Sequence, residues 1–445
     1  MRGAMEKSST YINEQRREYA LYVLQTRALP LISDGLKSSG RRALWTARTK
    51  TQWKTATLAG AMMPLHPHGD SSGSINTLAA PYGNNIPLLH GDGAFGTLLE
   101  PCAYGASRYT SVKLSDFTKD VVFADLEIVP MVENYDSTLL EPKHFLPLIP
   151  ITLLNSSEGI AVGFASNILP RKLKDIIELQ IDHLQGKKIS KIPTPYFAPL
   201  DNKSHDQEKT DNDGIAYFFK GTFERLDKDS IQITKLPYGL SHNKFVDNLD
   251  NLIDKDVVSD YTDNSKNTIN VTVKLKRGIL STLDDDDIYN QFKLITRHVE
   301  NLNVIDFDGD KVWNPTPIEL ISAFTDWRLT WYKTRYDRLD RLLLEEVQKY
   351  QDILLAIKRN IGSTAKSTKS RAELKEFLQE IGIKNLDYIA DLPVYRFTAE
   401  EREKIEKKME EALEKLKEYK ELLSNEGKRR KVFISELNEV LEKYA

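Results

Sequence analysis

The spacing of apolar residues predicts two long helices in the last third of the chain. Between positions 316 and 361, apolar side chains recur every three or four residues, which places them on one face of a helix. A second stripe of this kind follows Thr398, which forms a helix-starting pair with Glu401, and it ends at 425–427. With the short segment 362–397 between them, the two helices predict either an antiparallel coiled-coil arm with a globular tip or an ordinary helical hairpin.

Shorter helices are expected near the start of the chain, separated by prolines and polar turns. The predicted helices cover 11–29, 41–49, 54–62 and 72–80. The second and third are joined by a short polar turn, as in a helix-turn-helix. A short strand at 86–89 and a strand-and-loop segment at 91–114 follow. This order predicts a winged-helix DNA-binding domain.

The middle of the chain carries short apolar or alternating stretches, which indicate strands mixed with helices. Strands are expected at 121–130, 145–154, 231–234 and 270–275, and helices at 244–253 and 287–301. A turn within 155–163 should lead into a buried apolar run, while 190–215 and the acidic run 284–287 should be loops. The fold class expected from these elements is α+β with several domains.

Length and composition indicate a globular protein. The 445 residues would form about three domains of ~150 residues, with 40% hydrophobic and 29% charged residues. The longest apolar run, 145–154, is broken by two prolines and is shorter than the ~20 residues that span a bilayer. A single cysteine, Cys102, excludes an internal disulfide. We therefore expect a cytoplasmic protein that does not contact a membrane.

Charge is distributed unevenly along the chain. The net charge is −3, but residues 1–120 carry 14 Lys and Arg against 9 Asp and Glu, a balance of +5. The remainder of the chain is therefore acidic. A basic first part fits a polyphosphate partner such as DNA.

Within this basic part, Tyr109 directly follows Arg108, after a run of small residues. A phenol is a poor nucleophile at neutral pH because its unperturbed pKa is about 10. A neighbouring guanidinium favours the phenolate and can stabilise charge that builds on a phosphoryl oxygen. By itself the dipeptide is better explained as an exposed loop tyrosine, so its context decides the interpretation.

That context is a set of short motifs in a fixed order. They are RALP from Arg27, DGLK from Asp34, RR from Arg41, HPHGD from His66, GDGAFG from Gly91 and RYT from Arg108. Six motifs in this order resemble the breakage-reunion subunit of type IIA DNA topoisomerases, the class of gyrase A and topoisomerase IV A. The short chain is most similar to the phage branch of that class.

The resemblance implies an order of domains. These are an N-terminal helical arm at 1–30, a winged-helix domain with the nucleophilic tyrosine at 31–165, an αβ tower domain at 166–315, and a coiled-coil arm with a dimer gate at 316–445, its tip near 362–397. Because the chain stops at Ala445, it would lack the DNA-wrapping propeller of gyrase A. Relaxation or decatenation is then expected rather than negative supercoiling.

The resemblance also implies roles for individual residues. Tyr109 would attack a DNA phosphodiester to give a 5′-phosphotyrosyl link, Arg108 would stabilise the transition state, and His68 would transfer a proton or contact phosphate. Ile160 would wedge between base pairs and bend the duplex, although a core isoleucine is the alternative. The other residues expected to contact DNA are Arg27, Lys37, Arg41, Arg42, His66, Ser71, Thr110 and Lys244.

The family further implies what other chains would supply. The sequence has no P-loop and no convincing carboxylate cluster for the metal ions that phosphoryl transfer usually needs. Mg²⁺ would be held mainly by a partner's Toprim domain, and ATP would be bound by a partner's ATPase domain. The expected partners are therefore double-stranded DNA, ATPase and Toprim subunits, and a second copy of this chain.

Several positions depart from the family pattern, including Pro64 and Leu65 before HPHGD, where Lys and Tyr are usual. Ser38 replaces the usual proline after DGLK, and Ala94 replaces the usual asparagine in the glycine-rich turn. Ser71 matches the serine at which quinolones bind, but Ile75 takes the place of the acidic residue that accompanies it. The resemblance therefore implies weak quinolone binding.

Two other functions remain open from the sequence. A rolling-circle relaxase also combines a His-x-His pair with a nucleophilic tyrosine, although Pro67 between the histidines is unusual for it. A non-catalytic architectural DNA binder with a coiled-coil dimer arm would share the basic region and the helical stripes. A covalent protein–DNA adduct distinguishes both from a topoisomerase.

Overall fold

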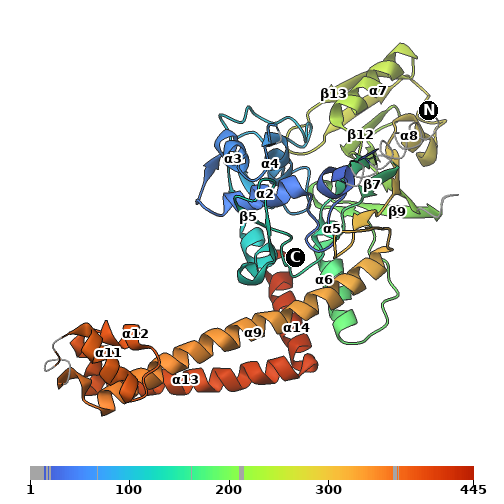
Figure 1. The fold of residues 1–445 in the computed structure, drawn as a ribbon. Coiled ribbons are helices and arrows are strands. Elements are labelled where there is room, and N and C mark those ends of the chain that lie inside the picture. Colours follow the sequence, from blue (N-terminus) through green and yellow to red (C-terminus); the bar gives the residue numbers. More distant parts are fainter. Residues whose placement is uncertain are drawn as a thin grey trace, which may run out of the picture. The chain divides into compact units, whose positions relative to one another are not determined.

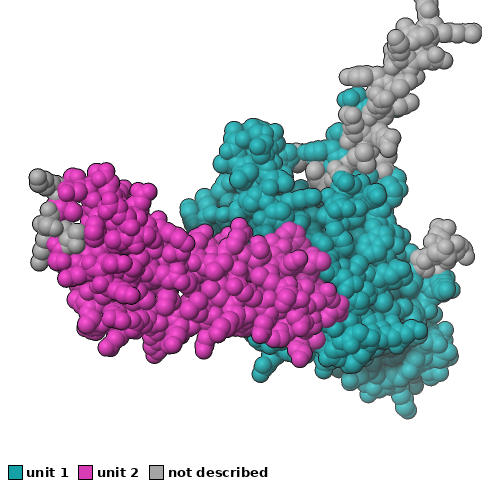
Figure 2. Space-filling view, turned by 60° about the horizontal axis from the view of Figure 1, so that its bottom comes forward, with its two compact units in different colours: residues 1–328, 435–445 teal, residues 329–434 magenta. Residues whose placement is uncertain are grey.

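The structure is a computed structural model in which the chain divides into two compact units (Figures 1 and 2). Unit 1 comprises Met1–Arg328 and Ser435–Ala445, and unit 2 comprises Leu329–Ile434. The described residues are 15–16, 19, 22–67, 69–161, 163–209, 215–363, 368 and 370–445. Part of the predicted helix at 11–29 lies outside them, and its last described turn is π-helical, η1 (Leu24–Ala28).

Three short helices near the start of unit 1 confirm the sequence-based expectation. They are α2 (Ser38–Ala47), α3 (Thr55–Met62) and α4 (Ser72–Ala79). Small and aliphatic side chains on their facing sides are fully buried, including Ala43, Leu44 and Leu58. Removing these side chains from water favours the packed arrangement of the three helices.

A small antiparallel sheet follows the helices, with strand order β1 (Trp53–Lys54), β3 (Ser111–Leu114), β2 (Leu89–Asp92). The strand predicted at 86–89 begins only at Leu89. Pro87 lacks the N–H donor that a paired strand residue supplies, which explains the later start. Strand β3 is central and pairs with β1 on one side and β2 on the other, so the chain just before β3 leads into a strand that is held by two neighbours.

Two strand predictions after this sheet are wrong. The segment contains η2 (Thr118–Val122), η3 (Leu126–Ile128), the hairpin of β4 (Met131–Glu133) and β5 (Leu140–Pro142), and α5 (Ile151–Leu154). Residues 121–130 therefore form mainly helical turns, and 145–154 end in a helix. The apolar run is buried, with Phe145 fully enclosed, but Pro147 and Pro150 remove the donors that a central strand needs. An apolar run of this length does not by itself distinguish a strand from other buried backbone.

The next elements are a hairpin and a helix, namely β6 (Ser157–Ala161), β7 (Phe164–Ile168) and α6 (Leu173–Leu184). The sequence pattern predicted a buried apolar run after the turn within 155–163. That prediction is wrong, because Ile160 is 88% exposed. The pairing within the hairpin places Ile160 opposite Ala165 and leaves the side chain of Ile160 uncovered.

Two four-stranded antiparallel sheets form the rest of unit 1. One has the order β15 (Ile295–Glu300), β10 (Ile215–Lys220), β9 (Asn202–Lys209), β8 (Tyr196–Phe197). The other has the order β11 (Thr222–Arg225), β12 (Ser230–Lys235), β14 (Val271–Leu275), β13 (Val258–Asp263), and α7 (His242–Asp254) and α8 (Asp285–Gln291) share its core. The strands predicted at 231–234 and 270–275 and the helix at 244–253 are confirmed.

Three expectations in this region are corrected. Residues 190–215 are not a plain loop, because the whole of β8 and β9 lies there. The helix predicted at 287–301 ends at Gln291, and Lys293 adopts φ 55° before the chain continues as β15. The acidic run is not a loop either: Asp284 caps α8 and Asp287 completes a reciprocal capping box. Carboxylates at a helix N-terminus are stabilised by free backbone N–H groups, so this clustering has a structural cause.

The long helices predicted from the heptad-like stripes are present. α9 (Pro317–Lys358) and α13 (Ala399–Ser424) pack along each other in unit 2, with Val347 buried against Ala412 and Leu416 (Figure 1). Thr398 caps α13 by accepting from the backbone N of Glu401, whereas the Glu401 side chain pairs with Arg396. Only half of the expected capping box therefore forms.

A small helical cluster lies between these two helices in the chain. It contains α11 (Arg371–Glu380), α12 (Leu386–Ala390) and η5 (Val394–Phe397), and its apolar core includes Ile353, Leu378 and Ile405. A further helix, α14 (Glu426–Tyr444), begins directly after α13 and was not predicted. A two-stranded pair, β16 (Val304–Ile305) and β17 (Val312–Trp313), precedes α9. Among the described residues, no helix combines the length and apolarity needed to cross a membrane.

Candidate functional site

Tyr109 lies in a tight turn immediately before the central strand β3, and its side chain is 71% exposed. The turn is closed by a hydrogen bond from the Tyr109 N–H to the Ala106 carbonyl at 2.8 Å. Its neighbour Thr110 is buried, and its hydroxyl bonds to that of Thr55 at 2.8 Å. The backbone of Thr55 also donates to the Thr110 carbonyl at 3.1 Å. An exposed phenol therefore stands on a turn that is anchored to the start of α3.

Two cationic side chains lie beside this tyrosine. The guanidinium carbon of Arg108 is 4.7 Å from the centre of the Tyr109 ring, and Lys54 Nζ donates to the Tyr109 carbonyl at 3.3 Å. The sequence predicted the first contact but not the second. Lys54 reaches the site because β1 pairs with β3, a neighbour relation that no local pattern in the sequence indicates.

Glycines behind the turn leave no room for side chains. A Cβ on Gly105 would lie 3.2 Å from both Ala94 Cβ and Thr110 Cγ2, and one on Gly93, which has φ +105°, would lie 3.3 Å from Thr110 Cγ2. The small residues that we expected to admit a polyanion thus also have a packing role. Ala94, which departs from the family pattern, forms part of this tight contact.

Four of the predicted DNA-binding residues line one cavity of about 190 Å³ between η1, α2 and α4: Arg27, Arg42, His66 and Ser71. Tyr109 does not line this cavity. His66 Nε2 is 3.3 Å from the Tyr22 hydroxyl, and its ring meets that of Tyr135 edge-on at 6.1 Å. His68 lies outside the described residues.

The two arginines at the start of α2 are both paired with carboxylates. Arg41 forms two hydrogen bonds to Asp34, at 2.6 and 2.9 Å, and Arg42 forms two to Glu141, at 2.6 and 2.8 Å. Asp34 is fully buried and also accepts from the backbone of Phe145. Both arginines are therefore oriented by the protein, and whether they contact DNA stays a prediction. The sequence motif contained Asp34 without revealing this role.

Lys37 and Ile160 are brought together by the hairpin β6–β7. Lys37 Nζ donates to the Glu158 carbonyl at 2.5 Å, and its burial lowers the pKa of its ammonium group from the usual value. A Cβ on Gly159 would lie 1.9 Å from the Ala28 carbonyl oxygen, so the hairpin touches the end of η1 directly. Ile160 projects from this fixed base into solvent, which rules out the alternative that it is a core residue.

Lys244, the remaining candidate, is exposed in the first turn of α7. Helix α7 packs on the second four-stranded sheet, and Lys244 does not line the cavity of Arg27 and His66. Within the described part of the chain, no group of three or more His, Cys, Asp or Glu side chains could hold a metal ion. The candidate site thus consists of an exposed tyrosine with nearby cations, a separate basic cavity and an apolar hairpin.

Comparison with known families identifies the class of protein to which these residues belong. The chain belongs to the family of the A subunits of DNA gyrase and topoisomerase IV, whose family model matches residues 27–438. It is thus a component of the type II DNA topoisomerase class, as the motifs predicted. Neither the relaxase nor the architectural protein is favoured by this assignment.

Relatives of known identity fall in the same family. The DNA topoisomerase medium subunit of Enterobacteria phage T4 is 29% identical over 417 residues, covering 88% of this chain and 90% of that protein. The A subunit of DNA topoisomerase 4 from Pseudomonas aeruginosa is 27% identical, covering 100% of this chain and 62% of that protein. The A subunit of DNA gyrase from Brachyspira hyodysenteriae is 26% identical, and this chain spans 56% of its length.

A solved structure with the same fold is the DNA-binding, cleavage and re-ligation domain of Plasmodium falciparum topoisomerase II. The TM-score is 0.80, with 22% sequence identity, and the match covers 94% of this chain and 62% of that chain. The α+β architecture with a long helical arm is therefore the architecture of a topoisomerase II cleavage region.

Proposed function

We propose that this chain is the DNA cleavage and religation subunit of an ATP-dependent type II topoisomerase, with Tyr109 as its nucleophile. The observation that carries the proposal is the exposed Tyr109 phenol beside Arg108, on a turn fixed by Thr55 and Thr110. A nucleophile must reach the phosphorus from solvent while its backbone stays in place, and this turn meets both conditions.

The proposed reaction is a reversible transesterification. The Tyr109 oxygen attacks a DNA phosphorus, and the bond from phosphorus to the 3′ oxygen breaks, leaving a 5′-phosphotyrosyl link and a free 3′-hydroxyl. The phenolic proton passes to a base, for which His68 is our candidate, and a proton is returned to the leaving 3′ oxygen. Resealing reverses these steps. It needs no ATP, because the phosphotyrosyl link conserves the energy of the broken phosphodiester bond.

Arg108 is proposed to stabilise the charge that builds on the phosphoryl oxygens. Replacing Arg108 with alanine should slow DNA cleavage by about 10²–10³-fold, the loss typical of one preorganised charge-stabilising donor. Single-turnover cleavage measured with saturating DNA tests this. Lys113→Ala is the matched control, since it removes an exposed cation from the adjacent strand β3. Equal losses in both variants would mean that only overall charge matters.

Phosphate contacts are assigned to the basic cavity and to Lys37. Arg27, Arg42 and His66 face a common space, and Lys37 sits at the base of the β6–β7 hairpin. Together with Arg41, Ser71 and Lys244, these residues remain our candidates for contacts along the DNA backbone, whereas the predicted contact of Thr110 is replaced by a buried hydrogen bond to Thr55. Such contacts would fix the register of the duplex relative to Tyr109.

Ile160 is proposed to wedge between base pairs. Replacing it with alanine should leave the stability of the protein unchanged, because the side chain is exposed, and should reduce DNA bending with about tenfold weaker binding. Fluorescence transfer between the ends of a labelled duplex measures the bend. Leu226→Ala, at another solvent-facing position in the turn between β11 and β12, should bend DNA normally. A normal bend with Ile160→Ala would contradict the wedge.

The domain roles follow from the proposed function. Helices α2 to α4 with the sheet β1–β3–β2 are proposed to be a winged helix, and the two four-stranded sheets a tower domain along flanking DNA. The helices α9 and α13 with their tip are proposed to be a coiled-coil arm with a dimer gate. We place these domains at 31–165, 166–315 and 316–445.

Partner chains are proposed to supply the metal ion and ATP. The described residues do not form a set of donors suited to Mg²⁺, so we assign the metal ion to a partner's Toprim domain and ATP to its ATPase domain. We propose that two copies of the chain assemble with these subunits on double-stranded DNA, in the cytoplasm of the cell.

The test is to trap covalent complexes. The chain would be mixed with duplex DNA, Mg²⁺ and the candidate ATPase and Toprim partner, and then denatured with detergent. A double-strand, 5′-linked adduct that requires the partner supports the proposal. A single-strand adduct without any partner would instead indicate a relaxase, and DNA binding without an adduct would indicate an architectural protein.

A further inference from the structure

The segment after strand β3, residues 115–128, contacts both helices that lead between unit 1 and unit 2, namely α9 at Arg328 and α14 at its last turn. We call it the anchor segment. Helix α9 leaves unit 1 after Arg328, and helix α14 re-enters it at Ser435. Contacts from both helices converge on two acids of the anchor segment, Asp120 and Asp125, and all the residues involved belong to unit 1.

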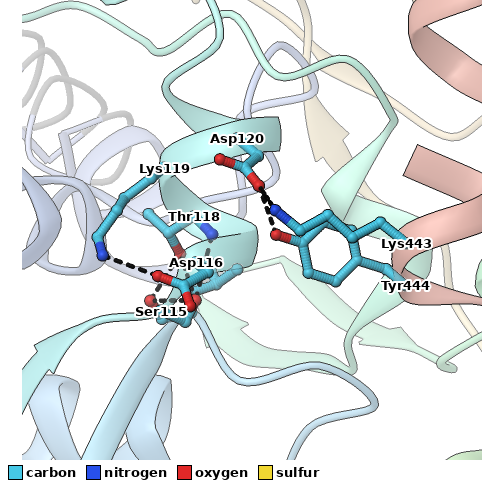
Figure 3. Close-up of polar contacts among 8 residues, drawn as sticks. Ser115, Asp116, Thr118, Lys119, Asp120, Lys443 and Tyr444 are labelled. Carbon is cyan, nitrogen blue, oxygen red and sulfur yellow. Dashed lines mark hydrogen bonds and ion pairs between the residues drawn. The ribbon is translucent and has the colours of Figure 1, made fainter. Parts of the chain in front are cut away.

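The returning helix α14 is bound through its last turn (Figure 3). One oxygen of Asp120 accepts from Lys443 Nζ at 2.6 Å and from the Tyr444 hydroxyl at 2.6 Å. The Tyr444 ring also meets buried Phe117 edge-on, with 5.2 Å between ring centres. A charge pair, a charge-assisted hydrogen bond and an aromatic contact thus act on one turn of helix, which gives the contact a defined orientation.

Helix α9 is bound by Asp125, which lies five residues after Asp120 in the anchor segment. Arg328 is fully buried, pairs with Asp125, and donates from Nε to the Pro147 carbonyl at 3.0 Å. Breaking a buried pair of this kind is costly, so this end of the arm is held firmly. The Asp120 contact is different, because Asp120 is 43% exposed and water weakens it. The anchor segment therefore has one permanent and one weaker attachment.

The anchor segment is also joined rigidly to the strand that begins next to Tyr109. The Leu88 carbonyl accepts from the Ser115 N–H at 3.2 Å, the Ser115 hydroxyl at 3.0 Å and the Thr118 hydroxyl at 2.6 Å. These bonds tie the start of η2 to the residue before β2, which pairs with β3. A displacement of η2 would therefore be passed to β3 and to the turn of Tyr109.

We propose that Asp120 is a positioning residue for Tyr109: through Lys443 and Tyr444 it couples the end of α14 to the strand that carries the nucleophile. The unit 1 parts of α9 and α14 then both contact the anchor segment. Release of the weaker contact would loosen β3 while the pair of Arg328 and Asp125 still holds the first part of α9 within unit 1. The link to Tyr109 chemistry rests on the proposed function, but the mechanical coupling does not.

Hydrogen exchange on the full chain tests the coupling directly. Asp120→Asn should speed amide exchange within residues 109–122 by about two- to fivefold, the range expected for loss of an exposed charge pair. Tyr444→Phe should act in the same direction. Asp116→Asn is the matched control, because it removes the same charge from the same segment but breaks a local pair with Lys119 (Figure 3). Unchanged exchange in Asp120→Asn, or an equal change in the control, would overturn the coupling.

The same variants then test the effect on Tyr109. With DNA, Mg²⁺ and the partner chain, Asp120→Asn should change the fraction of covalently held DNA at equilibrium by about twofold or more, with unchanged DNA affinity. Combining Asp120→Lys with Lys443→Asp should restore the wild-type fraction. Altered exchange with an unaltered fraction would overturn the positioning role. If the wild type forms no adduct, the proposed function fails while the exchange result still decides the coupling.

Discussion

A chain in which Tyr109 is replaced by phenylalanine is expected to form at least about 10⁴-fold less covalent DNA adduct, because removing a nucleophile leaves only binding and charge stabilisation. Its DNA affinity should stay within about twofold, since the side chain is exposed and its hydroxyl does not support the turn. Quantifying detergent-trapped adduct against DNA binding in the same preparation measures both quantities. Loss of binding together with the adduct would mean that the substitution damaged the turn.

Tyr104→Phe is the matched control for this experiment. Tyr104 lies five residues upstream in the same loop, and burial raises the pKa of its phenol to about 12. A phenol of that kind stays protonated at neutral pH and is a poor nucleophile. Adduct formation should therefore persist in Tyr104→Phe. If Tyr104→Phe abolished the adduct and Tyr109→Phe did not, the assignment of the nucleophile would be wrong.

The largest expected effect on stability comes from Glu300→Ala. Glu300 pairs with Arg171, which is fully buried, through hydrogen bonds of 2.9 and 2.6 Å, and it also accepts from the Leu169 N–H at 3.0 Å. Removing the carboxylate leaves a buried guanidinium without its counter-charge. We expect the free energy of unfolding to fall by about 3–5 kcal/mol. Urea denaturation, followed by the shift of the midpoint at constant slope, measures the loss.

An exposed pair supplies the control for that prediction. Glu178 and Lys174 lie one turn apart on α6, and both are about half exposed. Glu178→Ala should change the free energy of unfolding by about 0.5 kcal/mol or less, because solvent screens such pairs. If Glu300→Ala lowered the free energy of unfolding as little as Glu178→Ala, Arg171 would be accommodated without Glu300, for example by its bonds to the carbonyls of Leu169 and Pro193.

The sequence predicted those elements whose signal is local. Heptad-like stripes located α9 and α13, and Thr398 marked the start of α13 within one residue. The family motifs located Tyr109 and Arg108, whose side chains lie in contact at an exposed turn. In each case neighbouring residues in the chain contain the whole signal, so no knowledge of distant contacts was needed.

Features that depend on distant residues were missed. The carboxylates that orient Arg41 and Arg42 are 7 and 99 residues away, and Lys54 reaches Tyr109 only because two strands pair. The sequence predicts a strand at 145–154, where the structure has a helix at its end, because a short buried apolar run has the same pattern in a strand and in a helix. Helix α14 was missed because Asn425, interpreted as the end of α13, also precedes a new helix.

The close approach of Gly159 to the Ala28 carbonyl limits how the sequence of the β6–β7 hairpin can vary. The hairpin rests on another stretch of main chain, so its reach toward a duplex is fixed by two backbones and not by any side chain. Under the proposed wedge role of Ile160, changes in the size of residue 160 would alter how far a base step opens while the hairpin keeps its place. A side chain at 159 would meet the Ala28 carbonyl and shift the hairpin, so the proposed bend is adjusted through residue 160 while residue 159 stays glycine.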